Sequence, residues 1–576
     1  MNRLDHAVIG ALVLVLAVIA VAIGMPAVTP TAVTATPTPI PVPPVEPYRE
    51  GAVGRPYSVN PLAARTQVDR DLVALVFGGL VRLGPEGTLV GDIASRWTVD
   101  ETGKTWVFTI RPDARWHDGT PLTSDDVVFT VDVMRDPSYT GPGAGSWREV
   151  AAIAVDARTV RFDLATPIGG FLHLATQAIA PAHLLRGVPV ENLAEAPFGR
   201  TPVGSGSFTI VELDDDHAVL EPAVGEQPEP SAVGIQSAPP PDPLATPVPT
   251  RRPSVAMPLL PRLEFTFFDD AAALAEAFRS GEVDVVSGLS PAAAAELSQE
   301  DGARPLRYPG TTLTTVILNL RPSHAELRDP AVRGALQAAI DQQGVITEAF
   351  GGLAGKADSP IPPTSWAFDS TASPGVAHDA AAATAALTKA GWTKVDERLR
   401  PPGAKEAYTV ELVVPDAVTN PTLHAVAEQV AAAWDAVGLT VKLVEAEPGA
   451  FLSEYLREGK YTAAVIDVAI GHDPDLYPLL ASSQTQSGGL NVMGLQDATL
   501  DALLTAARKP GTDDVRKAAY TALQTQLASG RYVLPIAFAD EVVVVRDELD
   551  GPVVQPVADP SDRFWDVLTW RLANDR

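Results

Sequence analysis

The sequence of 576 residues contains no cysteine, which excludes disulfides, thiol nucleophiles and cysteine-ligated metal sites. Positive charge is also scarce: 43 lysines and arginines stand against 71 aspartates and glutamates, for a net charge of -28. Such a chain repels nucleic acid and anionic membrane surfaces, so we do not expect nucleic acid as a partner. Apolar residues make up 46% of the chain, which is typical of a well-buried globular protein. The chain is too long to fold around a single hydrophobic core, so its length predicts two or three domains.

One long apolar run stands at the N-terminus. Residues 7–25 carry no charge and lie between Arg3 and Pro26, and their number is close to the roughly 20 residues that a membrane-spanning helix needs. A cleaved signal usually has a shorter apolar centre. Although Val33-Thr34-Ala35 could serve as a cleavage site, residues 1–25 are predicted as an uncleaved membrane anchor with Arg3 inside.

Two segments are rich in proline. Residues 26–47 alternate proline with threonine, valine and alanine, which predicts an extended stalk. Residues 222–261 hold few large apolar groups and lie between strands expected at 208–220 and 263–268. We interpret this second segment as a disordered surface insertion, which costs little free energy because loop-closure entropy grows only logarithmically with length.

Helices and strands alternate through the rest of the chain. The spacing of apolar residues predicts helices over 271–280 and 423–437. Strand, helix and strand over 410–444 form a βαβ unit, which predicts a parallel or mixed sheet and an α/β protein. Further strands are expected at 463–468 and 533–545.

The segment from residue 91 to 134 has the clearest local signals. Trp106, Phe108 and Ile110 alternate with polar or smaller residues, as in a half-buried strand. Thr123 or Ser124 is expected to cap the helix that follows. The sequence therefore predicts a hairpin that leads into a helix.

A series of short motifs follows in a fixed order along the chain: FGGL at 77–80, IASRW at 93–97, DETG at 100–103, WHDGTPLTSDDV at 116–127, PVGSGSF at 202–208, SGEVDVV at 280–286, Asn319, and DPAVRGALQAAID at 329–341. In this order they resemble the motifs of the large solute-binding proteins of ABC importers, the class that captures oligopeptides, dipeptides and nickel chelates. The resemblance covers most of the chain from about Tyr48 to the C-terminus.

The resemblance implies a two-lobed periplasmic-binding-protein-like α/β fold of type II, with an extra α/β domain inserted in the first lobe. The first lobe would comprise residues 48–68, 201–308 and 530–576, the inserted domain 69–200, and the second lobe 309–529.

By the same resemblance, the protein would bind a peptide-like or other small solute in the cleft between the lobes and close by a hinge, without catalysis and without a cofactor. Its partners would be an ABC permease with its ATPases. We expect a monomer at the extracytoplasmic face of the membrane, held there by the N-terminal helix or secreted after cleavage of that helix.

Three residues outside the main ligand segment are candidates to line the cleft. Trp147 follows a glycine-rich loop and is either an edge of the core or a lid on the ligand. Trp366 matches a family segment near the cleft. Asn60 is near the cleft in relatives, although turn chemistry alone explains it.

The segment after residue 465 should reveal the class of solute. In peptide-binding relatives it carries an acidic residue that neutralises the ammonium group of the ligand. Aligned on Asp473 and the proline after it, this chain has Asp467 for the family's tryptophan, Ile470 for the acid and Gly471 for its tyrosine. We predict that Asp467, Ile470, Gly471, His472 and Asp473 line the cleft, and that unmodified peptides bind weakly. Asp467, His472 and Asp475 are the candidate replacements for the acid.

Two other functions are alternatives. A metal-assisted hydrolase could use His117 and Asp118, but a third ligand at helical or hairpin spacing is missing, and the Asp-Gly pair at 118–119 favours a turn. A surface sensor or chaperone-like module could use the same fold without a permease.

Overall fold

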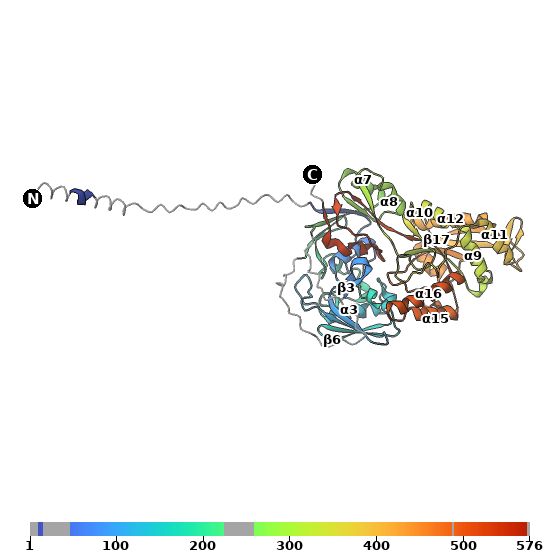
Figure 1. Ribbon diagram of the computed structural model, residues 1–576, viewed down its shortest axis with the longest axis horizontal. Coiled ribbons are helices and arrows are strands. Elements are labelled where there is room, and N and C mark those ends of the chain that lie inside the picture. Colours follow the sequence, from blue (N-terminus) through green and yellow to red (C-terminus); the bar gives the residue numbers. More distant parts are fainter. Residues whose placement is uncertain (1–9, 15–45, 224–258, 487–488, 573–576) are drawn as a thin grey trace, which may run out of the picture. The chain divides into compact units, whose positions relative to one another are not determined.

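The computed structural model describes residues 10–14, 46–223, 259–486 and 489–572 (Figure 1). The chain divides into two compact units, residues 1–45 and 46–576. Of the predicted anchor, only residues 10–14 are described, and they are helical. Across the described ranges, no helix is both long enough and apolar enough to cross a bilayer. All but the last two residues of the predicted stalk, and most of the proline-rich insertion, lie outside the described residues.

The second unit contains a seven-stranded sheet, with β1 at its centre and parallel to both of its neighbours. Its strands are, in spatial order, β12 (Ala303–Tyr308), β21 (Glu541–Arg546), β11 (Val285–Ser287), β1 (Tyr48–Val53), β10 (Leu263–Phe268), β9 (His217–Pro222) and β8 (Phe208–Leu213). Helix α7 (Ala271–Ser280) has the predicted bounds: Asp270 caps its start, and Gly281, at φ 81°, ends it.

A six-stranded sheet comes mainly from later residues. Its strands are, in order, β14 (Ala354–Lys356), β20 (Val533–Ala539), β13 (Thr312–Leu318), β19 (Ala463–Ala469), β17 (Thr409–Pro415) and β18 (Thr440–Ala446). Strands β17 and β18 are parallel and are joined by α12 (Pro421–Ala436), which confirms the predicted βαβ unit. The helix buries Val426, Val430 and Trp434, a stripe with a spacing of four residues, against the sheet.

A separate four-stranded antiparallel sheet contains the hairpin expected near residue 106. Its strands are, in order, β4 (Ala94–Val99), β5 (Thr105–Ile110), β7 (Thr159–Leu164) and β6 (Val150–Asp156). Helix α3 (Ser124–Arg135) packs on β6 and begins with a capping box between Thr123 and Asp126, which confirms the predicted cap.

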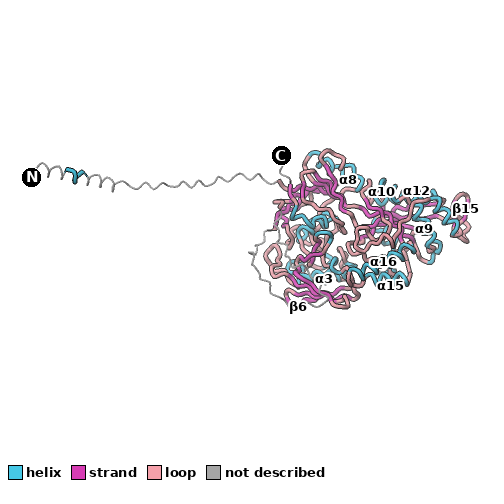
Figure 2. The backbone as a smooth tube through the Cα atoms, in the orientation of Figure 1, coloured by secondary structure: helices cyan, strands magenta, loops and turns pink. Residues whose placement is uncertain are grey.

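The remaining helices of eight residues or more cover the sheets. Their bounds are α2 (Gln67–Val76), α9 (Pro330–Ala339), α10 (Gln342–Phe350), α11 (Ala380–Lys389), α15 (Ala498–Ala507), α16 (Asp513–Gly530) and the 3-10 helix η7 (Pro560–Thr569). Helix α9 packs against α11, α10 against α12, and α15 against α16; the last two pairs can be followed in Figures 1 and 2.

The chain crosses between the two large sheets at two neighbouring places. Residues 309–311 connect β12 to β13, and Asp540 connects β20 to β21. The single strand predicted over 533–545 is therefore wrong, because β20 pairs in the six-stranded sheet and β21 in the seven-stranded sheet. The predicted lobe boundary at residue 530 likewise differs from the sheet topology, since the crossing comes ten residues later. The apolar run continues through the crossing, so its composition does not reveal the change of sheet.

Strands β9 and β10 are antiparallel neighbours although the proline-rich segment separates them. Leu220 lies opposite Leu263. The ends of the segment are thus held side by side by sheet hydrogen bonds, as in a hairpin with a long loop.

Candidate functional site

A paired carboxylate and guanidinium form the centre of the site. Arg516, on α16, donates two hydrogen bonds to Asp473, at 2.7 and 2.9 Å. The side chain of Asp473 is 7% exposed and that of Arg516 is 12% exposed. Burial alone would lower the pKa of Arg516, but the carboxylate raises it above its ordinary value. The charge of Asp473 is therefore already balanced within the protein.

Aromatic rings surround this ion pair. The guanidinium of Arg516 lies 4.6 Å from the ring centroid of Trp366, a cation–π contact. Tyr520 packs edge-on against Trp366 at 5.2 Å, and burial raises its pKa. Two residues predicted from the sequence, Trp366 and Asp473, thus meet through Arg516, which the sequence analysis did not single out. Arg516 and Tyr520 are four residues apart on one helical face, a spacing that could have indicated their shared role.

The domain with the four-stranded sheet contacts the same place. The amide of Gly169 donates to the carbonyl of Arg508 at 2.7 Å. A Cβ atom on Gly170 would lie 2.8 Å from the Cβ of Asp473, which is closer than real side chains approach. Glycine at 170 therefore permits direct contact between this domain and the six-stranded part.

His472 connects three parts of the chain. Its Nε2 lies 3.1 Å from Oδ2 of Asp562, on η7, and its ring stacks on that of His173 at 5.7 Å. Burial lowers the pKa of His173 to about 4, so this histidine is neutral at pH 7. Gly471 precedes His472 with φ 81°, a left-handed conformation that favours glycine and turns the chain here.

Ile470 occupies the position at which the resemblance implies an acidic partner for a ligand ammonium. Its side chain is buried in the core of the six-stranded part, and its amide donates to the carbonyl of Thr311 at the first strand crossing, at 3.2 Å. Asp475, a candidate replacement, forms an ion pair with Arg508, whose Nε lies 2.9 Å from a carboxylate oxygen. Neither residue offers a free charge.

Asp467 differs from its neighbours in the segment. One carboxylate oxygen accepts a hydrogen bond from the hydroxyl of Thr314 at 2.6 Å, and no cationic side chain among the described residues pairs with it. The residue is exposed to solvent, yet desolvation by the surrounding protein raises its pKa.

Glu541, at the start of β21, is a second carboxylate without a cationic partner among the described residues. The sequence did not predict it as a site residue. Within the described ranges it forms no ion pair or side-chain hydrogen bond. Burial raises its pKa to about 7; Arg563 opposes the shift, and Asp71 and nearby carboxylates add to it. Its place beside the second strand crossing could not be read from the sequence, because the crossing itself was not recognised.

The structure places Asn60 and Trp147 in tightly packed surroundings. The amide of Asn60 is fully buried, donates to the carbonyl of Leu193 at 3.2 Å and accepts from the amide of Leu62. Trp147 is 3% exposed and packs against Phe162 and Phe171. These contacts are sufficient to explain both residues by a structural role. Their predicted role in ligand binding stays a prediction.

His117 and Asp118 have structural partners. The two ring nitrogens of His117 lie within hydrogen-bond distance of the Gly206 carbonyl and the Thr209 hydroxyl, and Asp118 pairs with His183 at 2.9 Å. Gly119, at φ 86°, completes the predicted turn. In the part of the chain that the structure describes, no group of three or more histidine or acidic side chains is placed to hold a metal ion.

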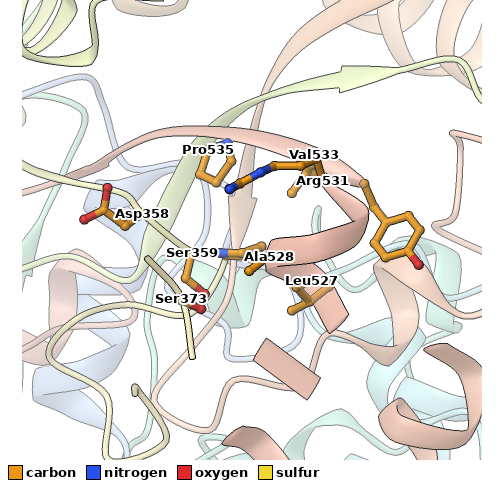
Figure 3. A pocket seen from close by; sticks show the side chains of 10 residues that line it. Asp358, Ser359, Ser373, Leu527, Ala528, Arg531, Val533 and Pro535 are labelled. Atoms are coloured by element: carbon orange, nitrogen blue, oxygen red, sulfur yellow. The ribbon is translucent and has the colours of Figure 1, made fainter. Parts of the chain in front are cut away.

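A small pocket lies in the six-stranded part, at the end of α16 (Figure 3). Asp358, Ser359, Ser373 and Arg531 line it together with apolar side chains. Its space corresponds to about one water molecule, so it is far too small for a peptide.

Comparison with known proteins places this geometry in a family. Residues 88–489 match the family model described as bacterial extracellular solute-binding proteins, family 5 middle. The dipeptide-binding protein of Escherichia coli K12 is 24% identical over 542 residues, which cover 88% of this chain and 91% of that protein. The nickel-binding periplasmic protein of the same organism is 22% identical over 519 residues, with 87% of this chain and 91% of that protein covered.

Solved structures share the fold. The oligopeptide-binding protein AppA of Bacillus subtilis, in complex with a nonapeptide, superposes with a TM-score of 0.69 at 21% identity and covers 92% of this chain and all of its own. NikZ of Campylobacter jejuni, in complex with Ni(L-His), gives 0.70 at 20% identity with the same coverage. The fold is therefore the predicted two-lobed one, and the chain belongs to family 5 of the bacterial extracellular solute-binding proteins of ABC importers.

Proposed function

We propose that the protein captures one small solute, peptide-like or of another class, in the cleft between its lobes and delivers it to a membrane permease with ATPase subunits. The observation that carries the proposal is the pair of strand crossings at 309–311 and 540. Two short, adjacent connections between large sheets allow one lobe to rotate against the other with few backbone changes.

Closure of the two lobes would bring together the parts of the chain that form the site around Asp473 and His472. The contact of Gly170 with Asp473 and the stack of His173 on His472 join parts that are otherwise linked through the crossings. A bound solute would stabilise these contacts, since a ligand shifts a two-state equilibrium toward the state that it binds more tightly. No bond chemistry is needed for this function.

The peptide-like class is proposed because relatives are named as dipeptide- and oligopeptide-binding proteins, while the relative in complex with Ni(L-His) supports a wider range. We further propose that the apolar run at 7–25 anchors a monomer at the outer face of the cell membrane. N-terminal sequencing of the protein from its native host tests the anchor, because a chain that starts near Thr36 would mean a cleaved signal.

The solute itself is the test of the function. Full-length protein, purified in mild detergent without denaturation, should retain a small molecule at one per chain. Native mass spectrometry would show the added mass, and denaturation followed by liquid chromatography would release it for identification. Protein that carries no small molecule and binds none from a concentrated extract of its host would contradict the proposal.

A further inference from the structure

The segment that should contact the solute holds four acidic or histidine side chains, and three of them are already paired. The pairs are Asp473 with Arg516 at 2.7 Å, Asp475 with Arg508 at 2.9 Å, and His472 with Asp562 at 3.1 Å. The fourth, Asp467, accepts one hydrogen bond from a neutral hydroxyl. The structure thus distinguishes among the candidate replacements that the sequence left open.

Sheet register places Asp467 close to the crossings. Asp467 on β19 lies opposite Thr314 on β13, which in turn lies opposite Ala537 on β20. Three residues after Asp467, the amide of Ile470 binds the first crossing at Thr311. The carboxylate is therefore in the part of the six-stranded lobe that adjoins the hinge, where the two lobes of the fold meet.

A carboxylate in this position lacks part of its stabilisation. Protein atoms surround Asp467 closely enough to disfavour its charge, although water still reaches it. A desolvated charge without a partner costs free energy, and a cationic group that pairs with it recovers part of that cost. The hydrogen bond from Thr314 leaves the second carboxylate oxygen available to accept from such a group.

Other charges around the site favour a cation as well. The two arginines that pair with the segment, Arg508 and Arg516, are each bound to a carboxylate and offer no free charge to an anionic solute. Glu541 adds a further carboxylate without an ion pair among the described residues, beside the other crossing. The solute that complements this arrangement carries positive charge.

We propose that Asp467 binds a cationic group of the solute, an ammonium or a guanidinium, and that this contact selects for cationic solutes. The inference rests on the proposed function and names its class of solute. The resemblance implies that the ligand's cation is bound at position 470, which is the apolar Ile470 in this chain. We place the binding of the cation at a carboxylate three residues earlier. A cationic side chain or amine of an N-blocked solute fits this site, whereas a free peptide terminus directed at Ile470 finds no charge.

A competition among matched probes tests the proposal. Full-length protein is incubated with an equimolar library of N-acetylated tripeptide amides that have lysine, arginine or norleucine at the central position, and retained members are quantified by mass spectrometry after rapid gel filtration. Wild-type protein should retain lysine or arginine peptides at least about tenfold over the norleucine peptides. Asp467→Asn, which keeps the shape of the side chain, should abolish most of this preference.

Two variants serve as controls. Asp514→Asn removes an equal charge from an exposed position on α16 and should leave the preference unchanged. Thr314→Val removes the hydroxyl that orients the carboxylate and should reduce the preference less than Asp467→Asn does.

An unchanged preference in Asp467→Asn, or a wild-type preference for norleucine, would overturn the proposal while leaving the receptor function intact. If no library member is retained, the solute that co-purifies with the protein decides: one without a cationic group overturns the proposal, and one that has such a group and is lost in Asp467→Asn supports it. Absence of any bound solute would instead contradict the proposed function.

Discussion

The change Arg563→Met leaves two buried carboxylates without the guanidinium that they share. Arg563 is 1% exposed and donates to Asp71 at 2.8 and 3.0 Å and to Glu50 at 2.7 Å. Burial alone would lower the pKa of Arg563, but these carboxylates raise it well above its ordinary value. The cluster joins β1, α2 and η7, so its loss affects the core beside the seven-stranded sheet.

The expected loss of stability depends on whether the two carboxylates stay charged without Arg563 or take up a proton. Breaking a buried ion pair by removing one partner costs about 3–5 kcal/mol. Protonating one carboxylate instead costs at most about 4 kcal/mol at pH 7, because its unperturbed pKa is about 4 and each unit is worth about 1.4 kcal/mol. We therefore expect Arg563→Met to lower the free energy of unfolding by about 4 kcal/mol at pH 7.

The pH dependence has a definite sign. Burial already raises the pKa of Asp71 in the folded wild type, and the loss of Arg563 raises it further, so the variant loses more stability than wild type as pH increases above about 4. The difference from wild type should shrink to below about 2 kcal/mol at pH 5. Urea unfolding followed by circular dichroism at both pH values measures it.

A matched control is available at the surface. Arg571 pairs with Asp550 at 2.6 Å, with side chains 66% and 55% exposed, so Arg571→Met should cost less than about 1 kcal/mol. A cost of Arg563→Met similar to that of the control, or one that stays constant between pH 5 and 7, would refute the reasoning.

Three further predictions concern the insertion, a carboxylate and the smaller domain. Deleting residues 226–256 and rejoining the ends with a short Gly/Ser link should change the melting temperature only slightly, because Leu220 and Leu263 are already paired; a collapse of folding would show that the segment packs. Glu541→Gln should stabilise the ligand-free protein by on the order of 2 kcal/mol at pH 8 and have almost no effect at pH 4.5, as measured by urea unfolding. The reason is that the pKa of Glu541 is raised to about 7, so wild type loses stability as pH increases from 4.5 to 8. An equal effect of the substitution at the two pH values would contradict this. Trp147→Ala should lower stability by about 3–5 kcal/mol in the same assay, as for a core aromatic, and a loss under about 1 kcal/mol would favour the lid interpretation.

Local signals in the sequence predicted local structure well. The spacing of apolar residues predicted the bounds of α7, and Thr123 predicted the start of α3, because both signals act within a few turns of the helix itself. The run over 533–545 was predicted as one strand, since nothing in its apolar pattern shows that Asp540 passes from one sheet to another.

The site was predictable only in part. The segment around Asp473 was recognised from its resemblance to relatives, but the partners that neutralise it were not. Arg516 and Asp562 lie 43 and 90 residues away from the side chains that they bind, and only the fold brings them close. The sequence alone therefore does not show which carboxylate lacks a cationic partner. The tertiary structure shows that it is Asp467.

The central claim, that one cationic solute is held between the lobes at Asp467, is tested most directly by a crystal structure of the protein with its co-purified solute. The account predicts electron density for the solute between the two large sheets, with a nitrogen of its cationic group within about 3.2 Å of a carboxylate oxygen of Asp467. Solute density elsewhere on the molecule, or a neutral part of the solute against Asp467, would contradict the account.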